Sequence, residues 1–362
     1  MMITAGNGFI EQSDRYAFNN AGESLKKYIL LECGELAYNH GASKLRPYGS
    51  CFALTTVEKA RIPFVYHCFS VEKSNPEFLS IELNGANVEN QLRKIVSSGA
   101  RMDGLLNIAY SEYTEVTVQL PKKEEQDWIA KFFKQLDTLI TLHQRKYEKL
   151  VNIKKSMLDK MFPKNGASVP EIRFKGFTDP WEQRKVGTLI EDYTEKTVTQ
   201  NQYPVLTSSQ QQGIVLQEDY FADRQVTTDN NVGYYVLPKG YFTYRSRSDT
   251  DVFVFNRNNI VDKGIISYYY PVFAPKSCDS NFLLRRLNHG IKKQLSMAAE
   301  GTGQKVLAHA KFKNMVVDVP SQSEQEKIGT ILEELDTLIT LHQRKLEKLQ
   351  NIKKSCLEKM FV

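Results

Sequence analysis

Cysteine is scarce in this chain of 362 residues, and the pattern of the few cysteines excludes two kinds of site. The five are Cys33, Cys51, Cys68, Cys278 and Cys356. An odd number argues against a framework of disulfides, and the lack of any Cys-x-x-Cys pair argues against a zinc site. We therefore expect free thiols in a reducing compartment and no metal bound by this chain.

Long apolar runs are also lacking. No run approaches the ~20 residues that a helix needs to span a bilayer. The first fifteen residues, MMITAGNGFIEQSDR, lack the basic end and the apolar stretch of a secretory signal. We expect a soluble protein of the cytoplasm.

Charge of one sign is present only in mild excess. A net charge of +6 allows nucleic acid or another acidic partner but does not require one, and a few surplus surface lysines would account for it equally well. The hydrophobic content of 41% is sufficient for packed cores, so a disordered chain is excluded. The length indicates about two domains at ~150 residues each.

One internal repeat dominates the chain. Residues 121–162 and 320–361 align without a gap, and both contain the undecapeptide LDTLITLHQRK. Apolar residues recur in both copies at spacings of three and four, which predicts one long amphipathic helix in each. At ~1.5 Å per residue, a helix of ~40 residues spans about 60 Å.

Two such helices in one chain can pair as an antiparallel coiled coil, and each can also dock a partner protein. The residues expected to serve these contacts are Leu136, Leu139, Ile140, Leu150, Ile153 and Met157 in the first copy and Leu335, Leu338, Ile339, Leu349, Ile352 and Cys356 in the second. The cations of the opposite face are expected to be solvated; they are Arg145, Lys149, Lys154 and Lys155 and their equivalents Arg344, Lys348, Lys353 and Lys354. We expect His143 and His342 to be packed or solvated, because no other metal-binding residues lie near them in the pattern.

The segments that precede the helices have a different character, rich in Tyr, Phe, Val, Ile, Gly and Asn. Short alternating runs predict strands at residues 234–237, 241–244, 251–255 and 265–273. Residues 205–221, 238–245 and 273–287 resemble residues 2–18, 33–40 and 69–83, so the two segments are diverged copies of one another.

The predicted fold is therefore α+β, with two β-rich domains that are each followed by a long helix. The expected domains are residues 1–120, the helix 121–163, a linker with the second β-rich domain over 164–319, and the helix 320–362. We call residues 1–120 head one and residues 176–319 head two. Residue 2 aligns near residue 205, so we expect head one to lack a counterpart of the start of head two.

The sequence resembles the specificity subunits of bacterial type I restriction-modification systems over essentially its whole length. The resemblance rests on residues 171–189 (EIRFKGFTDPWEQRKVGTL), on the duplicated helix and on residues 301–328 (GTGQKVLAHAKFKNMVVDVPSQSEQEKI). The Pro-x-x-x-Glu-Gln entry to each helix is characteristic of that family; its residues are Pro121, Glu125 and Gln126, and Pro320, Glu324 and Gln325. The short start of head one departs from the family pattern and leaves open whether head one reads DNA.

The resemblance implies that each head is a target-recognition domain that reads one half of a split double-stranded DNA site. It also implies that the two helices set the gap between the halves. Two methyltransferase subunits, which bind S-adenosylmethionine, and motor-nuclease subunits, which use ATP, are the implied partners. The chain itself is implied to hold no cofactor. We expect half-sites on roughly one face of the duplex, about one ~34 Å helical turn apart.

Candidate DNA contacts follow from residue chemistry. Arginine can bind guanine O6 and N7 together, and a Gly/Ser/Thr turn beside a cation can hold a phosphate. The candidates are Lys44, Arg46, Arg61 and Arg101 in head one and Tyr244, Arg245, Ser246, Arg247, Thr302, Gln304 and Lys305 in head two. Ordinary surface charges and plain turns remain the alternative for each of them.

The sequence lacks the motifs typical of a methyltransferase, an ATPase or a dinucleotide-binding enzyme. Asn75-Pro76-Glu77-Phe78 lacks the second proline of an adenine methyltransferase loop, and no GxxxxGK[ST] phosphate loop occurs. Gly301-Thr302-Gly303 lacks the third glycine of a dinucleotide fingerprint. We expect no catalytic centre. A structural adaptor whose heads bind protein, an enzyme with an unfamiliar site and a silent cassette are the other readings of this chain.

Overall fold

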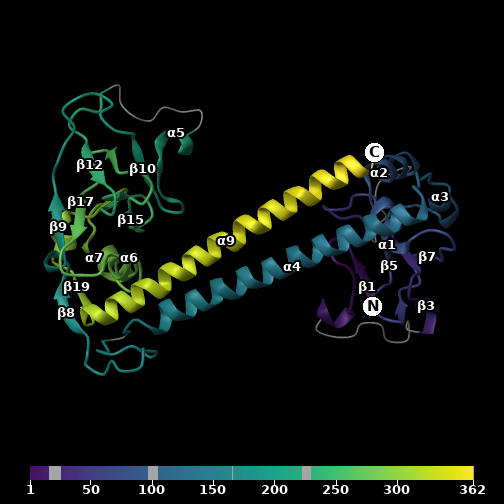
Figure 1. Cartoon of the computed structure of the whole chain (residues 1–362), viewed down its shortest axis with the longest axis horizontal. Helices are drawn as coiled ribbons and strands as arrows, with labels where there is room; N and C mark the ends of the chain where they lie inside the picture. The colour runs from purple at the N-terminus through teal and green to yellow at the C-terminus, as the bar shows by residue number, and fades with distance from the viewer. Residues whose placement is uncertain (16–25, 97–104, 165, 222–229, 362) are drawn as a thin grey trace. The chain divides into compact units, whose positions relative to one another are not determined.

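The structure is a computed structural model of the whole chain, and it describes residues 1–15, 26–96, 105–164, 166–221 and 230–361 (Figure 1). The chain divides into two compact units. The first consists of Met1–Arg145 and Gln343–Val362, and the second of Lys146–His342. Each unit thus contains one head together with the adjoining part of both long helices. Among the described helices, none is long and apolar enough to cross a membrane.

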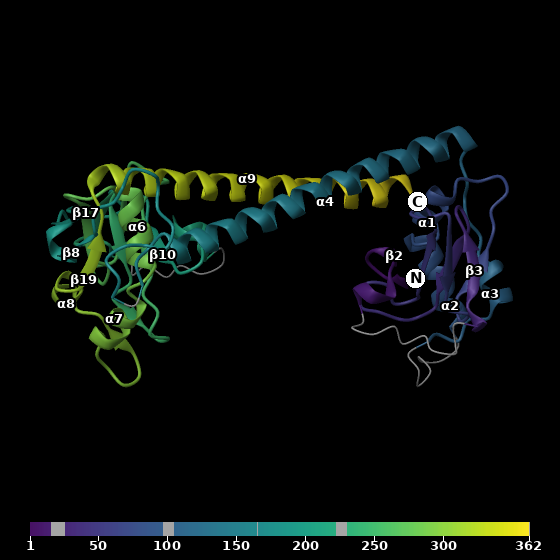
Figure 2. The ribbon, with the colours of Figure 1, turned by 90° about the horizontal axis from the view of Figure 1, so that it is seen from below.

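The two long helices are present as predicted, as α4 (Lys123–Lys160) and α9 (Gln322–Met360), and both begin two residues after the proline of their repeat. Within each unit they run antiparallel (Figures 1 and 2). In the first unit Lys353 forms an ion pair with Asp137, and in the second unit Lys154 forms one with Asp336. Asp137 and Asp336 are equivalent in the repeat, as are the two lysines, so both units use the same contact.

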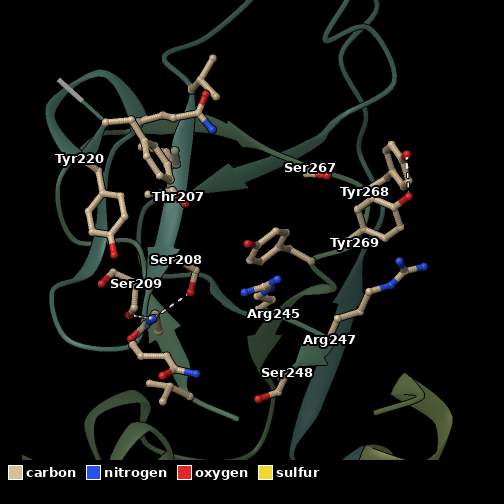
Figure 3. Close-up of a pocket in the computed structure, with 18 of the residues that line it drawn as sticks. Thr207, Ser208, Ser209, Tyr220, Arg245, Arg247, Ser248, Ser267, Tyr268 and Tyr269 are labelled. Atoms are coloured by element: carbon tan, nitrogen blue, oxygen red, sulfur yellow. Dashed lines mark hydrogen bonds between the residues drawn. The ribbon is translucent and has the colours of Figure 1, made fainter. Parts of the chain in front are cut away.

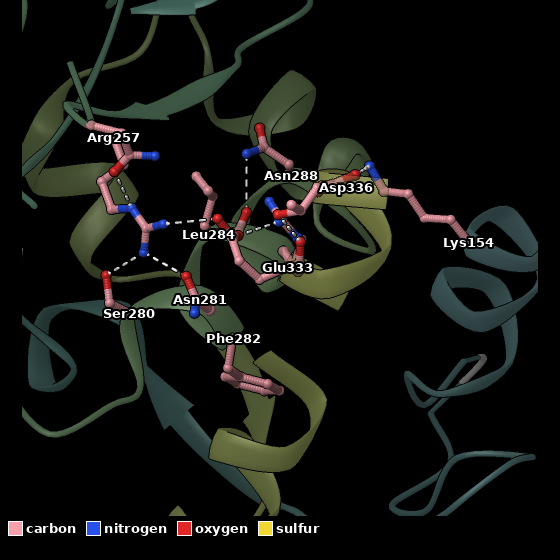
Figure 4. Close-up of polar contacts among 12 residues, drawn as sticks. Lys154, Arg257, Ser280, Asn281, Phe282, Leu284, Asn288, Glu333 and Asp336 are labelled. Carbon is pink, nitrogen blue, oxygen red and sulfur yellow. Dashed lines mark hydrogen bonds and ion pairs between the residues drawn. The ribbon is translucent and has the colours of Figure 1, made fainter. Parts of the chain in front are cut away.

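The prediction of a solvated face for Lys154 and Lys353 is therefore wrong, because both lysines lie at the contact between the helices. Figure 4 shows Lys154 beside Asp336. Asp336 also accepts Arg285 of head two at 2.6 Å, and Arg285 lies 2.8 Å from Glu333 of α9. A network of charges thus fixes head two to α9.

The apolar stripe is only partly covered. Leu136 and Leu335 are buried, and the other candidates that lie against the heads or helices are half-buried: Ile140, Leu150, Met157, Ile339, Leu349 and Cys356. The exposed candidates match between the copies, with Leu139 and Leu338 at 45% and 42% and Ile153 and Ile352 both at 38%. These four are the least covered candidates, because the stripe is wider than one neighbouring helix can cover. They leave the same apolar face open on α4 and on α9.

The pairing predicts a difference between two leucines that lie three residues apart on α9. Leu335→Ala should lower the free energy of unfolding by about 2–5 kcal/mol, because it removes a buried side chain and leaves a cavity. Leu338→Ala is the matched control and should cost less than about 1 kcal/mol, since Leu338 is exposed. Urea denaturation of both variants measures this, and equal losses would refute the assignment of the buried face.

Head two is built on an antiparallel sheet in the order β15-β13-β17-β9. Its strands are Phe255–Arg257, Phe242–Tyr244, Val272–Pro275 and Ile190–Tyr193. Helices α6 (Ser280–Asn288), α7 (Lys292–Ala298) and α8 (His309–Lys313) contribute to the same core, which also takes in Met161 and Phe162 from the end of the first helix repeat. Smaller pairs complete the head: β8 (Glu182–Lys185) with β19 (Val316–Val319), β10 (Leu206–Ser209) with β11 (Gly213–Leu216), β12 (Tyr235–Pro238) with β16 (Lys263–Ile266), and β14 (Arg247–Ser248) with β18 (Lys305–Val306).

Two of the strand predictions in head two are wrong. Residues 251–254 lie outside any strand, and Asp251 has a positive φ of 58° that an extended strand does not allow. The single strand expected over residues 265–273 is the end of β16 and the start of β17, separated by a turn in which Tyr270 N donates to Ser267 O at 2.9 Å. The strands predicted over 234–237 and 241–244 are confirmed as β12 and β13 within one residue at each end.

Head one repeats this plan. Its sheet has the order β5-β4-β7, with strands Ser50–Ala53, Leu36–Asn39 and His67–Phe69. The remaining elements are the pairs β1 (Met2–Thr4) with β2 (Gly8–Ile10) and β3 (Ile29–Glu32) with β6 (Lys59–Ile62), and helices α1 (Pro76–Glu82), α2 (Ala86–Ile95) and α3 (Tyr110–Thr114). The positive φ of Gly34 and Gly240, in the turns before β4 and β13, places Tyr38 opposite Tyr244, one residue away from the alignment that the sequence indicates.

The Pro-x-x-x-Glu-Gln motif has a structural role in both units. Gln126 accepts the backbone N–H of Asn75 at 2.9 Å and donates to Pro121 O at 2.9 Å. Gln325 makes the same two bonds to Asp279 and Pro320, with the same lengths. Because Asn75 and Asp279 are the N-caps of α1 and α6, each glutamine joins a head to its helix.

Candidate nucleic-acid interface

Head two contains a cavity of about 960 Å³ (Figure 3). One wall comes from β10 and from α5 (Gln217–Tyr220), and it presents the hydroxyl groups of Thr207, Ser208 and Ser209. The facing wall comes from the chain between β13 and β14 and from residues 267–270. A strand, a short helix and two connecting segments of the same head therefore shape one hollow that is open to solvent.

Two exposed arginines lie in the second wall. Arg245 follows β13, and Arg247 begins β14. The guanidinium carbon of Arg247 lies 4.3 Å from the centre of the Tyr269 ring, a cation–π contact that limits its orientations. Asp249 lies 4.0 Å from Arg245 and accepts Gln304 Nε2 at 3.0 Å, so the cavity holds acceptors as well as donors.

Tyrosines form the rest of this wall. Tyr268 and Tyr269 are 55% and 40% exposed, and Tyr268 donates its hydroxyl to that of Tyr269 at 3.0 Å. That hydrogen bond raises the pKa of Tyr268, and burial raises the pKa of Tyr270. Tyr268 and Tyr270 therefore stay neutral at physiological pH, and they offer hydroxyls and ring faces rather than negative charge.

This set of groups is suited to base edges and phosphates. Guanidinium groups bind guanine O6 and N7, a carboxylate accepts the amino group of cytosine, and hydroxyls serve either bases or phosphates. Tyrosine rings offer faces on which bases can stack. In the described part of the chain, no three His, Cys, Asp or Glu side chains gather as a metal site.

The other candidates of head two separate into three groups. Gln304 lines the cavity, and Thr302 is exposed on the turn beside it. Ser246 and Lys305 are half-buried, and Ser246 Oγ donates to Tyr269 O at 2.7 Å, which holds the tyrosine wall. Tyr244 is fully buried with its hydroxyl 3.3 Å from His309 Nδ1, and its pKa is raised by burial. The structure thus removes Tyr244 from the candidate contacts, because β13 is covered on both faces.

The structure does not gather the candidates of head one into one site. Lys44 is exposed on a loop, whereas Arg46 is half-buried and donates to Asn84 O at 2.6 Å, so it holds the loop against the head. Burial lowers the pKa of Arg46. Arg61 lies in β6 and lines a small hollow of about 300 Å³ that includes neither of the other two. Arg101 lies outside the described residues.

Several residues of the cavity were not predicted from the sequence. Tyr268, Tyr269 and Asp249 belong to the cavity, and so does Tyr220 of α5. The Ser-Tyr-Tyr-Tyr run at 267–270 was the available signal, but its aromatic content is also typical of a strand, which is how it was interpreted.

Comparison with known proteins matches this part of the chain to a family. The sequence model of the type I restriction modification DNA specificity domain matches residues 179–351, which include the whole cavity. The type I restriction enzyme MjaVIII specificity subunit of Methanocaldococcus jannaschii is 23% identical over 288 residues. That alignment covers 72% of this chain, and the chain spans 64% of the length of that relative.

A solved structure shares the fold. The S subunit of a type I restriction-modification system from M. genitalium superposes with a TM-score of 0.54 at 13% identity, over 93% of this chain and 85% of that one. The HsdS subunit from Thermoanaerobacter tengcongensis covers 92% of this chain and 81% of its own at 16% identity, with a TM-score of 0.43. Residues 179–351 match the type I restriction-modification DNA specificity domain, and the chain is similar in sequence to a type I specificity subunit.

Proposed function

We propose that this chain is the DNA-reading subunit of a type I restriction-modification complex. The observation that carries the proposal is the cavity of head two, where Arg245 and Arg247 stand beside exposed tyrosines and hydroxyl groups. The cavity lies inside the stretch that matches the DNA specificity domain. In this mechanism phosphate contacts position the head on the duplex, and contacts to base edges select the sequence.

Head one reads the other half-site in this proposal, and the helix pair holds the two reading surfaces at a fixed separation. The open apolar face that repeats on α4 and α9 supports docking of two copies of one partner, because Leu139, Ile153 and their equivalents present the same side chains twice. Those partners are the methyltransferase subunits, which bring S-adenosylmethionine and the chemistry. Motor-nuclease subunits with ATP complete the complex. This chain contributes binding and no catalytic step.

Two other functions are separated from this one by direct assays. A structural adaptor would bind no DNA duplex selectively, so selection from a random duplex pool by the complex with its methyltransferase would return no motif. An enzyme with its own site would transfer methyl groups as an isolated chain. We expect a split motif from the selection and no transfer by the chain alone.

Binding to the selected duplex should depend strongly on salt. If the two heads together neutralise roughly six phosphates, the slope of log affinity against log salt should be about −5. Fluorescence anisotropy of the assembled complex between 50 and 200 mM salt, the range over which this term is largest, measures the slope. A slope near zero would contradict anchoring through phosphates.

A further inference from the structure

A short hairpin projects from head two at the edge of the cavity. Residues 300–306 lie between α7 and α8, and the chain between these helices extends beyond both of them (Figure 2). Glu300 N donates to Val306 O at 3.0 Å, and Val306 N donates to Glu300 O at 2.7 Å. Residues 300–304 are all exposed, and Gln304 also lines the cavity. The hairpin therefore presents one cavity residue on an element that stands out from the head.

A glycine and a strand pair set the path of this hairpin. Gly301 has a φ of +122°, which residues with a side chain rarely adopt. A Cβ there would lie 2.2 Å from the carbonyl oxygen of Gln304, so the two backbones approach closely only because residue 301 is glycine. Strand β18 then pairs with β14, with Ser248 opposite Lys305. That register makes the next residues, Asp249 and Gln304, neighbours across the two strands.

This pairing fixes the orientation of the Gln304 amide. Gln304 Nε2 donates to Asp249 Oδ1 at 3.0 Å. The opposite orientation would place a carbonyl oxygen against a carboxylate, and neither group has a proton to donate. The turn that carries Asp249 is itself held, because Ser248 is buried and its Oγ accepts the backbone N–H of Thr250 at 3.2 Å. Among the described residues Asp249 is the only hydrogen-bond partner of the Gln304 side chain, which retains one N–H and its carbonyl oxygen for a ligand.

A donor and an acceptor side by side match one base of DNA. In the major groove adenine offers the acceptor N7 beside the donor N6, whereas guanine offers two acceptors. Cytosine offers one donor there, and thymine offers one acceptor. Adenine alone therefore satisfies both groups that Gln304 retains. The major groove, about 12 Å wide, also admits a two-stranded ribbon, which is the form of this hairpin.

We propose that the hairpin of residues 300–306 enters the major groove and that Gln304 selects an adenine there. Asp249 is the positioning residue, because it holds the amide in the orientation that adenine requires. The inference rests on the proposed function, since it takes head two as a reader of DNA, and it adds the base and the side chain that reads it. Arg245 and Arg247, in the same cavity, are suited to guanine instead.

The test uses the full chain in complex with its methyltransferase, without S-adenosylmethionine, and the selected duplex. 7-Deazaadenine, in which C–H replaces N7, is placed at each adenine of the motif in turn. We expect one adenine at which it weakens binding about tenfold in anisotropy titrations, since it removes one of two hydrogen bonds. Gln304→Ala should weaken binding of the unmodified duplex about 10- to 100-fold, because it removes both. In that variant the modified base at the same position should cause no further loss.

Two further variants separate reading from folding. Asp249→Ala leaves the glutamine in place but releases its amide, so the preference for adenine over 7-deazaadenine at that position should fall without vanishing. Gln183→Ala is the control, because Gln183 is an exposed glutamine of the same head in β8 and lies outside the cavity. It should keep both the affinity and the tenfold preference of the wild type.

The proposal is overturned if Gln304→Ala leaves the effect of 7-deazaadenine unchanged at every adenine of the motif. A loss of affinity that is equal for all duplexes, with a lower salt slope, would make Gln304 a phosphate contact and would overturn it as well. Both results leave the proposed function intact, because the wild-type complex still selects a motif. A wild-type complex that selects no motif would refute the two together.

Discussion

Replacing Arg245 or Arg247 by alanine should weaken binding of the selected duplex about 10- to 100-fold, since a bidentate arginine–guanine pair contributes about 1–3 kcal/mol. Both side chains are exposed in the cavity of head two, and Arg247 is already oriented by Tyr269. Lys239→Ala provides the control, because Lys239 is an exposed cation of the same head outside the cavity. Anisotropy titrations at one fixed salt concentration measure all three variants.

The pattern over sequences shows which arginine reads a base. A base-reading arginine loses discrimination at one position of the motif, whereas a phosphate-binding arginine loses affinity for all sequences alike and lowers the salt slope by about one. We expect Arg247 to read a base, since its cation–π contact with Tyr269 fixes the direction in which the guanidinium group points. Unchanged affinity and motif in both variants would exclude the cavity as the reading site.

Arg173→Ala should lower the free energy of unfolding by about 3–5 kcal/mol, because it leaves the enclosed carboxylate of Glu324 without a partner. Glu324→Gln in the same chain should recover much of the loss, since it removes the uncompensated charge. Equilibrium denaturation in urea measures both variants. It is followed by the fluorescence of Trp181, which lies in the core of head two. A loss below about 0.5 kcal/mol for Arg173→Ala would contradict the role of this ion pair.

The repeat supplies a matched control for that result. Glu125→Gln changes the same motif position in the other copy, where the side chain is exposed. It should change the free energy of unfolding by no more than about 0.5 kcal/mol, as surface substitutions usually do. The comparison of Glu125 with Glu324 tests whether burial of the motif glutamate determines its effect on the free energy of unfolding.

The helices were predictable because their signal is local and duplicated. The extent of α4 and α9 follows from apolar spacing and from the entry prolines. Which apolar residues are covered does not follow, because that depends on what packs against each turn. Leu136 and Leu139 are equally apolar, yet the first is buried and the second is exposed. The role of Lys154 was missed for the same reason, since its partner Asp336 lies far away in the sequence.

The candidate site was predictable in part. Arg245 and Arg247 stand out by residue type in the sequence, and both line the cavity. Tyr244 beside them was expected to be accessible. It lies in β13, whose sheet is covered on both faces, so every side chain of that strand is buried. The contact between Arg173 and Glu324 spans 151 residues, and no local pattern indicates it. Tertiary packing therefore decides most of the site.

Exchange of residues 176–319 for the equivalent head of another specificity subunit tests whether specificity resides in the heads. The design must preserve the ion pairs between head two and α9. Glu333 of α9 stays in the exchanged chain, whereas its partners Arg257 and Arg285 leave with the head. Head one uses the opposite polarity, with Lys134 of α4 paired to Glu77 at 2.6 Å. A donor head with arginines at both positions is therefore required, or Glu333→Gln in the acceptor.

The most direct measurement is the motif methylated in cells that carry the exchanged chain and its methyltransferase, read by single-molecule sequencing of methylated adenines. Head one and both helices are unchanged in that chain. The account predicts that one half-site changes to that of the donor, while the other half-site and the gap between them stay as they were. A change in both half-sites at once, or an unchanged motif, would contradict the reading of DNA by separate heads.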